Sequence, residues 1–479
     1  GRYRSWAERP VPYPFQVTEV RALPPGNPDD STALCYDPEH DLDLGSKARG
    51  SKAVKLAKTA KARDDFATVI ADEARRLGKM LPHGGIVGVI VNTVDSARKV
   101  HAQLQSVVGP PEKSEIYVEL QTGRMRPMDR IRLQREREAT SATTKLRYVV
   151  ATQCVEVGSE FSFDALVSEI ASLDALQQRF ALLRSDETCP GACRGSILAL
   201  SKQVDKETTH DRIYGTAPYR TWMWLNGRSR LAGKEKPVDM SVAAVHADLP
   251  ATVDGLLSPA RLAPVLLPAT LDLWAQTSPI PQTDPTLSPW LHGYDPKRKP
   301  HEPDCTLVWR ADLDANKPGT WLAQVNLCPP FPAEMMRVPA YAVRAWLAST
   351  EVTQFGDIEG QDREEDKEAD KKKPFQRRTL VKQLLRWNGE QSALVPYAKG
   401  GEVYVVPAEY GGVDAYGWNP EQKDPVPDVY EEASLVDESP SLRLIAGILG
   451  GSEIRAVVKT YCADLGAGDY PKAAEMLDV

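Results

Sequence analysis

The pattern of apolar and polar positions is most regular between residues 64 and 200, where short apolar runs alternate with amphipathic segments. Apolar residues recur at spacings of three and four over residues 64–81, which predicts a helix. Residues 84–92 (GGIVGVIVN) are almost wholly apolar, as in a strand buried on both faces of a parallel sheet. A second helix is predicted over 96–108 and another strand over 115–120. This alternation indicates an α/β fold.

Residues 145–184 continue the alternation and form the stretch around which the chain is organised. Tyr148–Ala151 predicts a buried strand, and Ala165–Val167 predicts another. Ser172 can cap a following helix, with Asp174 in the first turn, where the helix dipole favours a negative charge. Because α/β proteins present polar groups at the carboxyl edge of a parallel sheet, we expect the functional site at that edge.

Two short motifs in this stretch resemble those of superfamily 2 helicases. Residues 151–160 (ATQCVEVGSE) resemble motif V, and Gln178-Arg179-Phe180 resembles the opening of motif VI. The segment from Asp164 to Phe180 resembles the helicase–nuclease of type I CRISPR systems, most closely its type I-U (I-G) branch. The two motifs occur in the order and at the spacing of that family, and the wider resemblance runs from about residue 64 to about residue 440.

The resemblance implies a second RecA-like motor lobe with two sets of site residues. The residues expected to contact DNA phosphates are Thr93, Arg124, Thr152 and Gln153. The residues expected to face ATP across the cleft are Gly158, Glu160, Gln178 and Arg179. No catalytic residue and no metal ligand is assigned to this chain.

Two of the DNA assignments have simpler structural alternatives. Thr93 follows the strand over 84–92, and a capped strand-to-helix turn explains it equally well. The segment from Arg124 to Arg137 is rich in arginine and glutamate, which is also typical of a solvated helix face. The family places an arginine-bearing segment beside the DNA here, and the planar guanidinium suits phosphate.

The sequence departs from the family within motif VI, whose pattern is Q-R-x-G-R-x-x-R. Ala181 replaces the glycine, Leu182 the arginine finger and Ser185 the last arginine, while Arg184 stands one residue early. Either divergence that disables hydrolysis or two compensating reading-frame shifts would explain this. Because Leu182 is one helical turn after Gln178, we expect it to be at least partly exposed at the cleft face. In the alternative, Leu182 turns inward and Arg184 faces the cleft.

The sequence contains no phosphate-binding loop of the Walker A type. Residues 45–52 (GSKARGSK) come nearest, but they have Gly-Ser-Lys instead of Gly-Lys-Ser and follow no strand, so a basic connector is the better interpretation. We therefore expect the first motor lobe and the nuclease domain to lie outside this chain. ATP and Mg²⁺ are implied for the complete enzyme, and none is expected to bind this chain alone.

Composition adds limits on location and partners. The chain has 479 residues with 59 basic and 66 acidic side chains, for a net charge of −7, so any nucleic-acid contact must be a local patch. No apolar run approaches the roughly 20 residues that cross a bilayer. No signal peptide is visible, and the seven cysteines are scattered, which predicts a cytoplasmic protein without a membrane partner. The first residue is Gly1, which suggests a piece of a longer protein.

Three pairs of residues could suggest metal binding, and we interpret none of them as a site. Cys189 and Cys193 form the only close cysteine pair, without the second pair that a zinc site requires. The His-Asp dipeptides at 40–41 and 210–211 match the family nuclease, but too few histidines exist to complete a two-metal centre.

The predicted fold is an α/β, RecA-like parallel-sheet lobe followed by a mixed α/β accessory region and a small β-rich C-terminal module. The predicted segments are a connector (1–63), the lobe (64–205), the accessory region (206–360), a charged linker (361–378) and the module (379–479).

The predicted function is that of the C-terminal part of an ATP-dependent DNA helicase or translocase of the type I-U kind, acting on single-stranded invader DNA with a type I CRISPR effector complex as partner. One alternative is a non-catalytic, degenerate lobe that binds DNA or effector proteins. Another is a superfamily 2 helicase unrelated to CRISPR. Whether this chain itself is an enzyme is left open, because the family hydrolyses ATP and the chain lacks Walker A and the arginine finger.

Overall fold

The computed structural model describes most of the chain between residues 52 and 427. The described residues are 52–59, 63–81, 84–108, 115–140, 145–156, 161–184, 194–211, 213–231, 234–250, 252–253, 255–259, 265–275, 290, 302–327, 329–349, 356–357, 382–388 and 392–427.

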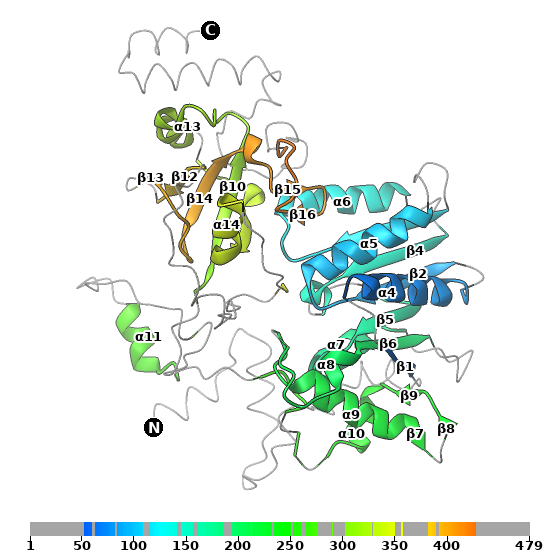
Figure 1. Cartoon of the computed structure of the whole chain (residues 1–479). Helices are drawn as coiled ribbons and strands as arrows, with labels where there is room; N and C mark the ends of the chain where they lie inside the picture. The colour runs from blue at the N-terminus through cyan, green and yellow to red at the C-terminus, as the bar shows by residue number, and fades with distance from the viewer. Residues whose placement is uncertain are drawn as a thin grey trace, which may run out of the picture.

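A seven-stranded sheet forms the centre of the first part of the molecule (Figure 1). Its strand order is β3-β4-β2-β5-β6-β1-β9, and every pairing is parallel except that of β9 with β1. The strands are β1 (Ala53–Thr59), β2 (Gly85–Ile90), β3 (Ile116–Gln121), β4 (Leu146–Ala151), β5 (Ala165–Glu169), β6 (Gly195–Leu200) and β9 (Val238–Asp239). Strand β1 comes from the segment predicted as a connector and pairs with β6.

Helices cover both faces of this sheet, as the apolar strand pattern predicted. Helices α4 (Arg63–Gly78) and α5 (Val94–Val108) share one apolar core with Val87 and Val89 of β2. Helices α7 (Leu173–Ala181) and α9 (Ala217–Ser229) share a second core with Ile90 on the opposite side of the same strand. Alternate residues of β2 therefore enter different cores, which is why the strand is apolar throughout. Gly88 leaves the space that the ring of Phe163 fills.

Smaller elements complete this part of the chain. They are α6 (Pro127–Thr140), α8 (Ser201–Val204), β7 (Arg230–Leu231), β8 (Lys234–Glu235), α10 (Val242–Ala247) and α11 (Pro268–Trp274). Among the described residues, no helix is long and apolar enough to cross a membrane.

A second sheet of five strands lies beside the first, with its own tryptophan-rich core (Figure 1). Its order is β11-β10-β14-β12-β13, from β10 (Asp304–Arg310), β11 (Met336–Pro339), β12 (Leu384–Trp387), β13 (Ala393–Val395) and β14 (Val403–Pro407). Helices α13 (Trp321–Leu327) and α14 (Ala340–Leu347) belong to this domain. Strands from the predicted segments 206–360 and 379–479 thus pair in one sheet. The predicted α/β fold with a parallel-sheet lobe is confirmed.

Arginines of the first part of the molecule connect it to the segment that contains a two-stranded sheet, β15-β16, and packs with the second core. Arg98 of α5 pairs with Asp414 of β15 (Val413–Asp414), with Nη1–Oδ2 at 2.5 Å. Arg126 Nη1 donates to the carbonyl of Pro427 at 2.6 Å, and Arg132 Nη2 donates to that of Ala415 at 2.9 Å. The amide of Trp418 in β16 (Gly417–Trp418) donates to the Arg124 carbonyl at 2.8 Å. Much of the arginine-rich segment is therefore part of an internal interface.

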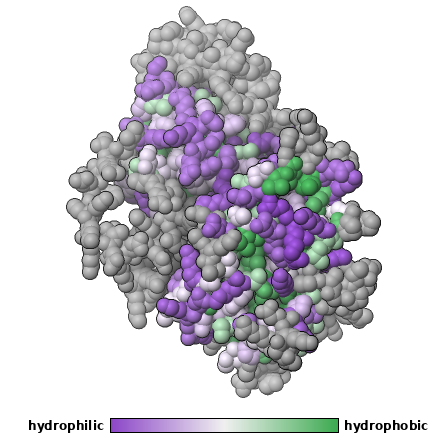
Figure 2. All heavy atoms as spheres, turned by 45° about the vertical axis from the view of Figure 1, so that its right-hand side comes forward, coloured by the Kyte–Doolittle hydropathy of each residue, from purple (hydrophilic) through white to green (hydrophobic). Residues whose placement is uncertain are grey.

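The described surface on one face of the molecule is mostly polar. In the view that brings the first sheet's side forward, hydrophilic side chains cover most of the visible described surface, with smaller apolar areas between them (Figure 2).

His101 of α5 lies in this interface, edge-on to the ring of Tyr416 with 4.6 Å between centroids. Burial lowers its pKa from 6.5 to about 4, and the charge of Arg98 adds to this. A backbone hydrogen bond with Val118 and the charge of Asp414 act in the opposite direction. In the unfolded chain the imidazole regains its ordinary pKa, so between these two values the unfolded state binds the proton more tightly.

We predict that acidification from about pH 7 to about pH 4.5 lowers the free energy of unfolding, with His101 contributing up to about 3 kcal/mol of the loss. His101→Gln should flatten this dependence in urea titrations followed by circular dichroism. His246→Gln, a change at an exposed histidine, is the matched control and should leave it unchanged. Equal pH dependence in wild type and His101→Gln would contradict the prediction.

Candidate functional site

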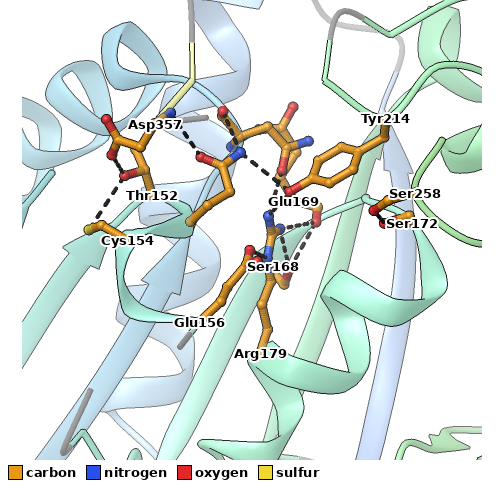
Figure 3. A network of polar contacts seen from close by, with 12 residues as sticks. Thr152, Cys154, Glu156, Ser168, Glu169, Ser172, Arg179, Tyr214, Ser258 and Asp357 are labelled. Atoms are coloured by element: carbon orange, nitrogen blue, oxygen red, sulfur yellow. Dashed lines mark hydrogen bonds and ion pairs between the residues drawn. The ribbon is translucent and has the colours of Figure 1, made fainter. Parts of the chain in front are cut away.

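A buried guanidinium, that of Arg179 on α7, organises the polar groups at the carboxyl ends of β2, β4 and β5 (Figure 3). A guanidinium has five N–H donors, and here each has a protein acceptor. The acceptors are Glu156 Oε1 (2.8 Å), Ser168 Oγ (3.1 Å), Glu169 O (3.0 Å), Asn92 Oδ1 (2.9 Å) and the Tyr214 hydroxyl (2.9 Å). One side chain therefore connects the ends of three strands to α7.

Asn92, immediately after β2, extends this network to its neighbours. Its backbone N–H donates to Glu169 Oε2 at 2.9 Å, and its side-chain Nδ2 donates to the Ile170 carbonyl at 2.7 Å. Its carbonyl accepts from Gln153 Nε2 at 2.8 Å. Gln153 begins the short 3-10 helix η3 (Gln153–Val155) that follows β4. The position of Gln153 is thus tied to the end of β2.

Two carboxylates and a buried phenol surround the cation of this network. The single cation of Arg179 faces Glu156, and the carboxylate of Glu169 accepts from Asn92 and from Gln203 Nε2 at 2.9 Å. Burial raises the pKa of Tyr214 well above its usual value, although the charge of Arg179 opposes this, so the hydroxyl stays protonated.

A second polar corner lies at the ends of β3 and β4. The carboxylate of Asp357 accepts from the backbone N–H of Gly123 at 2.7 Å and from the hydroxyl of Thr152. Arg124 Nε lies 3.6 Å from Asp357 Oδ1, and its Nη1 pairs with Asp304. These groups are all nearly buried.

Cys154, beside this corner, is not suited to nucleophilic chemistry. Burial raises the pKa of its thiol to about 12, and the nearby carboxylate of Asp357 adds to this. Because the thiolate is the reactive form, Cys154 is a neutral thiol at physiological pH.

The structure brings three of the predicted DNA-contact residues together around one group. Thr152 and Arg124 meet at Asp357, and the Asp357 backbone N–H donates to Gln153 Oε1 at 3.4 Å. Thr93 lies apart from this corner's hydrogen bonds: its hydroxyl accepts from the Ser96 N–H at 3.2 Å and donates to Ser96 Oγ at 2.8 Å. Thr93 therefore caps α5, which is the simpler alternative. The DNA roles of all four residues stay predictions.

The residues predicted to face ATP differ from one another in how accessible they are. Gln178 is exposed on α7, whereas Arg179 is fully buried with its donors bound to protein groups. Gly158 and Glu160 lie outside the described residues. The described part of the chain thus offers one accessible side chain from this set.

The helix carrying the motif VI resemblance ends where the sequence departs from the family. Helix α7 ends at Ala181, and Leu182 follows as its C-cap. Leu182 is partly exposed, as expected, and also packs against the apolar core. Arg184 is exposed and pairs with Asp164 at 2.8 Å.

Sequence reasoning missed several members of the network. Glu156 and Glu169 have a signal that could have identified them, because both lie at or just beyond the end of a buried strand. Tyr214 and Asp357 have no such signal, because they come from distant parts of the chain. Among the described residues, no group of three or more His, Cys, Asp or Glu is placed to hold a metal ion, and Cys189 and Cys193 lie outside them.

A family of known proteins matches the part of the chain that contains this site. Residues 83–183 match the family described as "CRISPR-associated nuclease/helicase Cas3, C-terminal". The matched residues include Asn92, Thr152, Gln153, Glu156 and Arg179. The resemblance to the C-terminal region of Cas3-type helicase–nucleases is therefore confirmed over this stretch, while the type I-U branch stays a prediction.

Solved structures of similar description also match the chain. "Crystal structure of CRISPR-associated protein" has 16% identity over 64% of this chain and 37% of that chain, with a TM-score of 0.36. "Crystal structure of T. fusca Cas3" has 17% identity over 62% and 37%, with a TM-score of 0.36. "Crystal structure of T. fusca Cas3-ADP" has 19% identity over 42% and 24%, with a TM-score of 0.32. The chain thus spans between about a quarter and a little more than a third of the length of these proteins. No curated protein matches it significantly.

We predict that Arg179→Ala destabilises the lobe by about 3–5 kcal/mol, because it leaves the nearly buried carboxylate of Glu156 without its partner. Arg179→Lys should recover only part of this loss, since an ammonium cannot reach the same acceptors. Arg184→Ala removes an exposed ion pair and should cost about 1 kcal/mol or less. Denaturant unfolding of the three variants checks this, and equal effects of Arg179→Ala and Arg184→Ala would refute it.

Proposed function

We propose that this chain is the second motor lobe and C-terminal region of a Cas3-like, ATP-dependent DNA translocase of CRISPR interference, resembling the type I-U branch. Its track would be single-stranded invader DNA, and its partners a type I effector complex, a first motor lobe and a nuclease domain. The observation that carries the proposal is the coincidence of the family match with the polar network at the sheet edge.

The Arg179 network suits the lobe to transmit movement. Arg179 is on α7, and its partners Asn92 and Glu156 follow β2 and β4. Asn92 in turn accepts from Gln153. Because these hydrogen bonds are buried and charge-assisted, a displacement of α7 is costly unless the strand-end residues move with it. A motor needs such a rigid connection between the face that senses the nucleotide and the face that holds DNA.

The proposed DNA contact uses neutral donors more than surface cations. The chain carries a net charge of −7, and Arg98, Arg124 and Arg126 are engaged within the interface between the two sheets. The neutral donors at the ends of β3 and β4 are a hydroxyl, a backbone N–H and a side-chain amide, those of Thr152, Gly123 and Gln153, which bond to protein groups in this structure. Such groups fix the position of a phosphate backbone without reading its bases, which fits a translocase that must move along any sequence.

The second candidate function is a non-catalytic lobe that binds DNA or effector proteins. It is favoured by Leu182, a partly exposed leucine where the family has its arginine finger. Adding a separate first motor lobe of the family in trans separates the two candidates. DNA-stimulated ATP hydrolysis by the mixture supports the translocase, and DNA binding without hydrolysis supports the non-catalytic lobe.

We predict weak, sequence-independent binding of labelled single-stranded DNA, which falls as salt rises because counterions compete for the phosphates. Gln153→Ala should weaken it about fivefold, the size of one lost hydrogen bond. Gln103→Ala, the same change at an exposed position of α5, is the control and should have no effect. Fluorescence anisotropy measures both, and strong sequence preference or salt-independent binding would count against the proposal.

We predict that the purified chain hydrolyses no ATP, with or without single-stranded DNA, because its sequence has no Walker A motif. A phosphate-release assay provides the measurement. Hydrolysis that disappears in Gln178→Ala would show that the chain has a nucleotide site of its own.

A further inference from the structure

A carboxylate from the C-terminal half of the chain occupies the corner between β3 and β4. Asp357 accepts from the Thr152 hydroxyl (Figure 3). It also accepts from the Gly123 backbone N–H at 2.7 Å, and Arg124 Nε lies 3.6 Å away. Its own backbone N–H donates to Gln153 at 3.4 Å. The Asp357 side chain is only 2% exposed. A backbone N–H and a hydroxyl therefore donate to one buried carboxylate, and a guanidinium lies beside it within ion-pair distance.

These donors form the kind of site that binds a phosphate group. Phosphate oxygens in protein–nucleic acid complexes are held by the same three kinds of donor. Gly123 permits the close approach, because a Cβ there would lie 3.0 Å from the Asp357 carboxyl carbon. A carboxylate and a phosphodiester each carry one negative charge, so either one can occupy such a site.

The positive charge at this corner can balance only one further anion, either Asp357 or a phosphate. Arg124 already pairs with Asp304, so its guanidinium faces two carboxylates when Asp357 is in place. A phosphate added beside Asp357 would meet a like charge in a nearly water-free corner, where charge repulsion is strong. Exchange of one anion for the other keeps the local charge unchanged.

We propose that Asp357 is an internal competitor for a backbone phosphate of single-stranded DNA at a site formed by Gly123, Arg124 and Thr152. The identity of the ligand as DNA rests on the proposed function, whereas the anion site rests on the donors alone. Asp357 holds the site closed to phosphate, and DNA gains this contact when Asp357 leaves. The contact thereby limits the affinity of the lobe for DNA.

The test compares Asp357→Asn with wild type in anisotropy titrations of a labelled oligothymidylate. Asparagine keeps the shape and removes the charge, so we expect affinity to rise about tenfold, the scale of one charge-assisted hydrogen bond. Asp72→Asn makes the same charge change at an exposed position of α4 and should shift affinity less than about twofold, as expected for surface charge alone. Adding Thr152→Val to Asp357→Asn should remove most of the gain.

A second measurement needs no DNA. Asp357→Ala leaves the Gly123 N–H and the Thr152 hydroxyl without their acceptor. Inorganic phosphate should therefore raise its melting temperature more than that of wild type, at ionic strength matched with chloride. This measurement stays valid if the alanine variant is less stable than wild type, because the melting temperature of each protein is compared with and without phosphate.

The outcomes separate this inference from the proposed function. Wild-type DNA affinity in a folded Asp357→Asn variant, with no phosphate effect on Asp357→Ala, overturns the inference and leaves the proposed function intact. Phosphate stabilisation without DNA binding by any variant supports the anion site and rejects the proposed function. Equal gains in Asp357→Asn and Asp72→Asn would show a general charge effect and also overturn the inference.

Discussion

The fully buried positive charge of Arg179 is the constraint on which the lobe's functional edge depends. Removing a guanidinium from water is costly unless every donor finds an acceptor in good geometry. Here the acceptors come from the residue after β2, the loop after β4, the end of β5 and Tyr214 just before α9. Because a shift of any one partner would leave a buried donor unsatisfied, these elements are held in one arrangement. The same hydrogen bonds therefore also fix the position of the strand end that carries Thr152 and Gln153.

The departure from the helicase pattern begins immediately after this constraint. Arg179 and its acceptors are present, and the changes start at Ala181, where α7 ends. The side chains that the fold needs are thus separate from those that the family has in the later part of motif VI. A lobe of this kind keeps its architecture while its chemistry toward a nucleotide changes, which makes both a translocase and a non-catalytic lobe compatible with the same fold.

Acidic residues from the C-terminal half of the chain bind arginines of the lobe in the interface. Arg98 pairs with Asp414, and Arg124 pairs with Asp304 and Asp357. The guanidinium geometry that suits a phosphate suits a carboxylate equally well. The domain built on the five-stranded sheet therefore fits against the lobe through groups that resemble a nucleic-acid backbone in charge and shape. This explains how a protein of net charge −7 can contain a cluster of buried arginines.

The sequence by itself determined the elements and the edge at which polar groups gather. The apolar runs of β2, β4 and β5 and the periodicity of α4 and α7 are local patterns, because each strand or helix must bury its own apolar face. Residues at strand ends, such as Asn92 and Thr152, follow from the same reasoning. Only the tertiary structure decided their partners. Tyr214 contacts Arg179 across 35 positions of the sequence within the lobe, and Asp357 contacts Thr152 across 205 positions. Such contacts depend on how distant segments of the chain pack together. Arg124 illustrates the physical reason. Its guanidinium favours an anionic partner of any kind, and the packing of the chain places the carboxylates of Asp304 and Asp357 beside it.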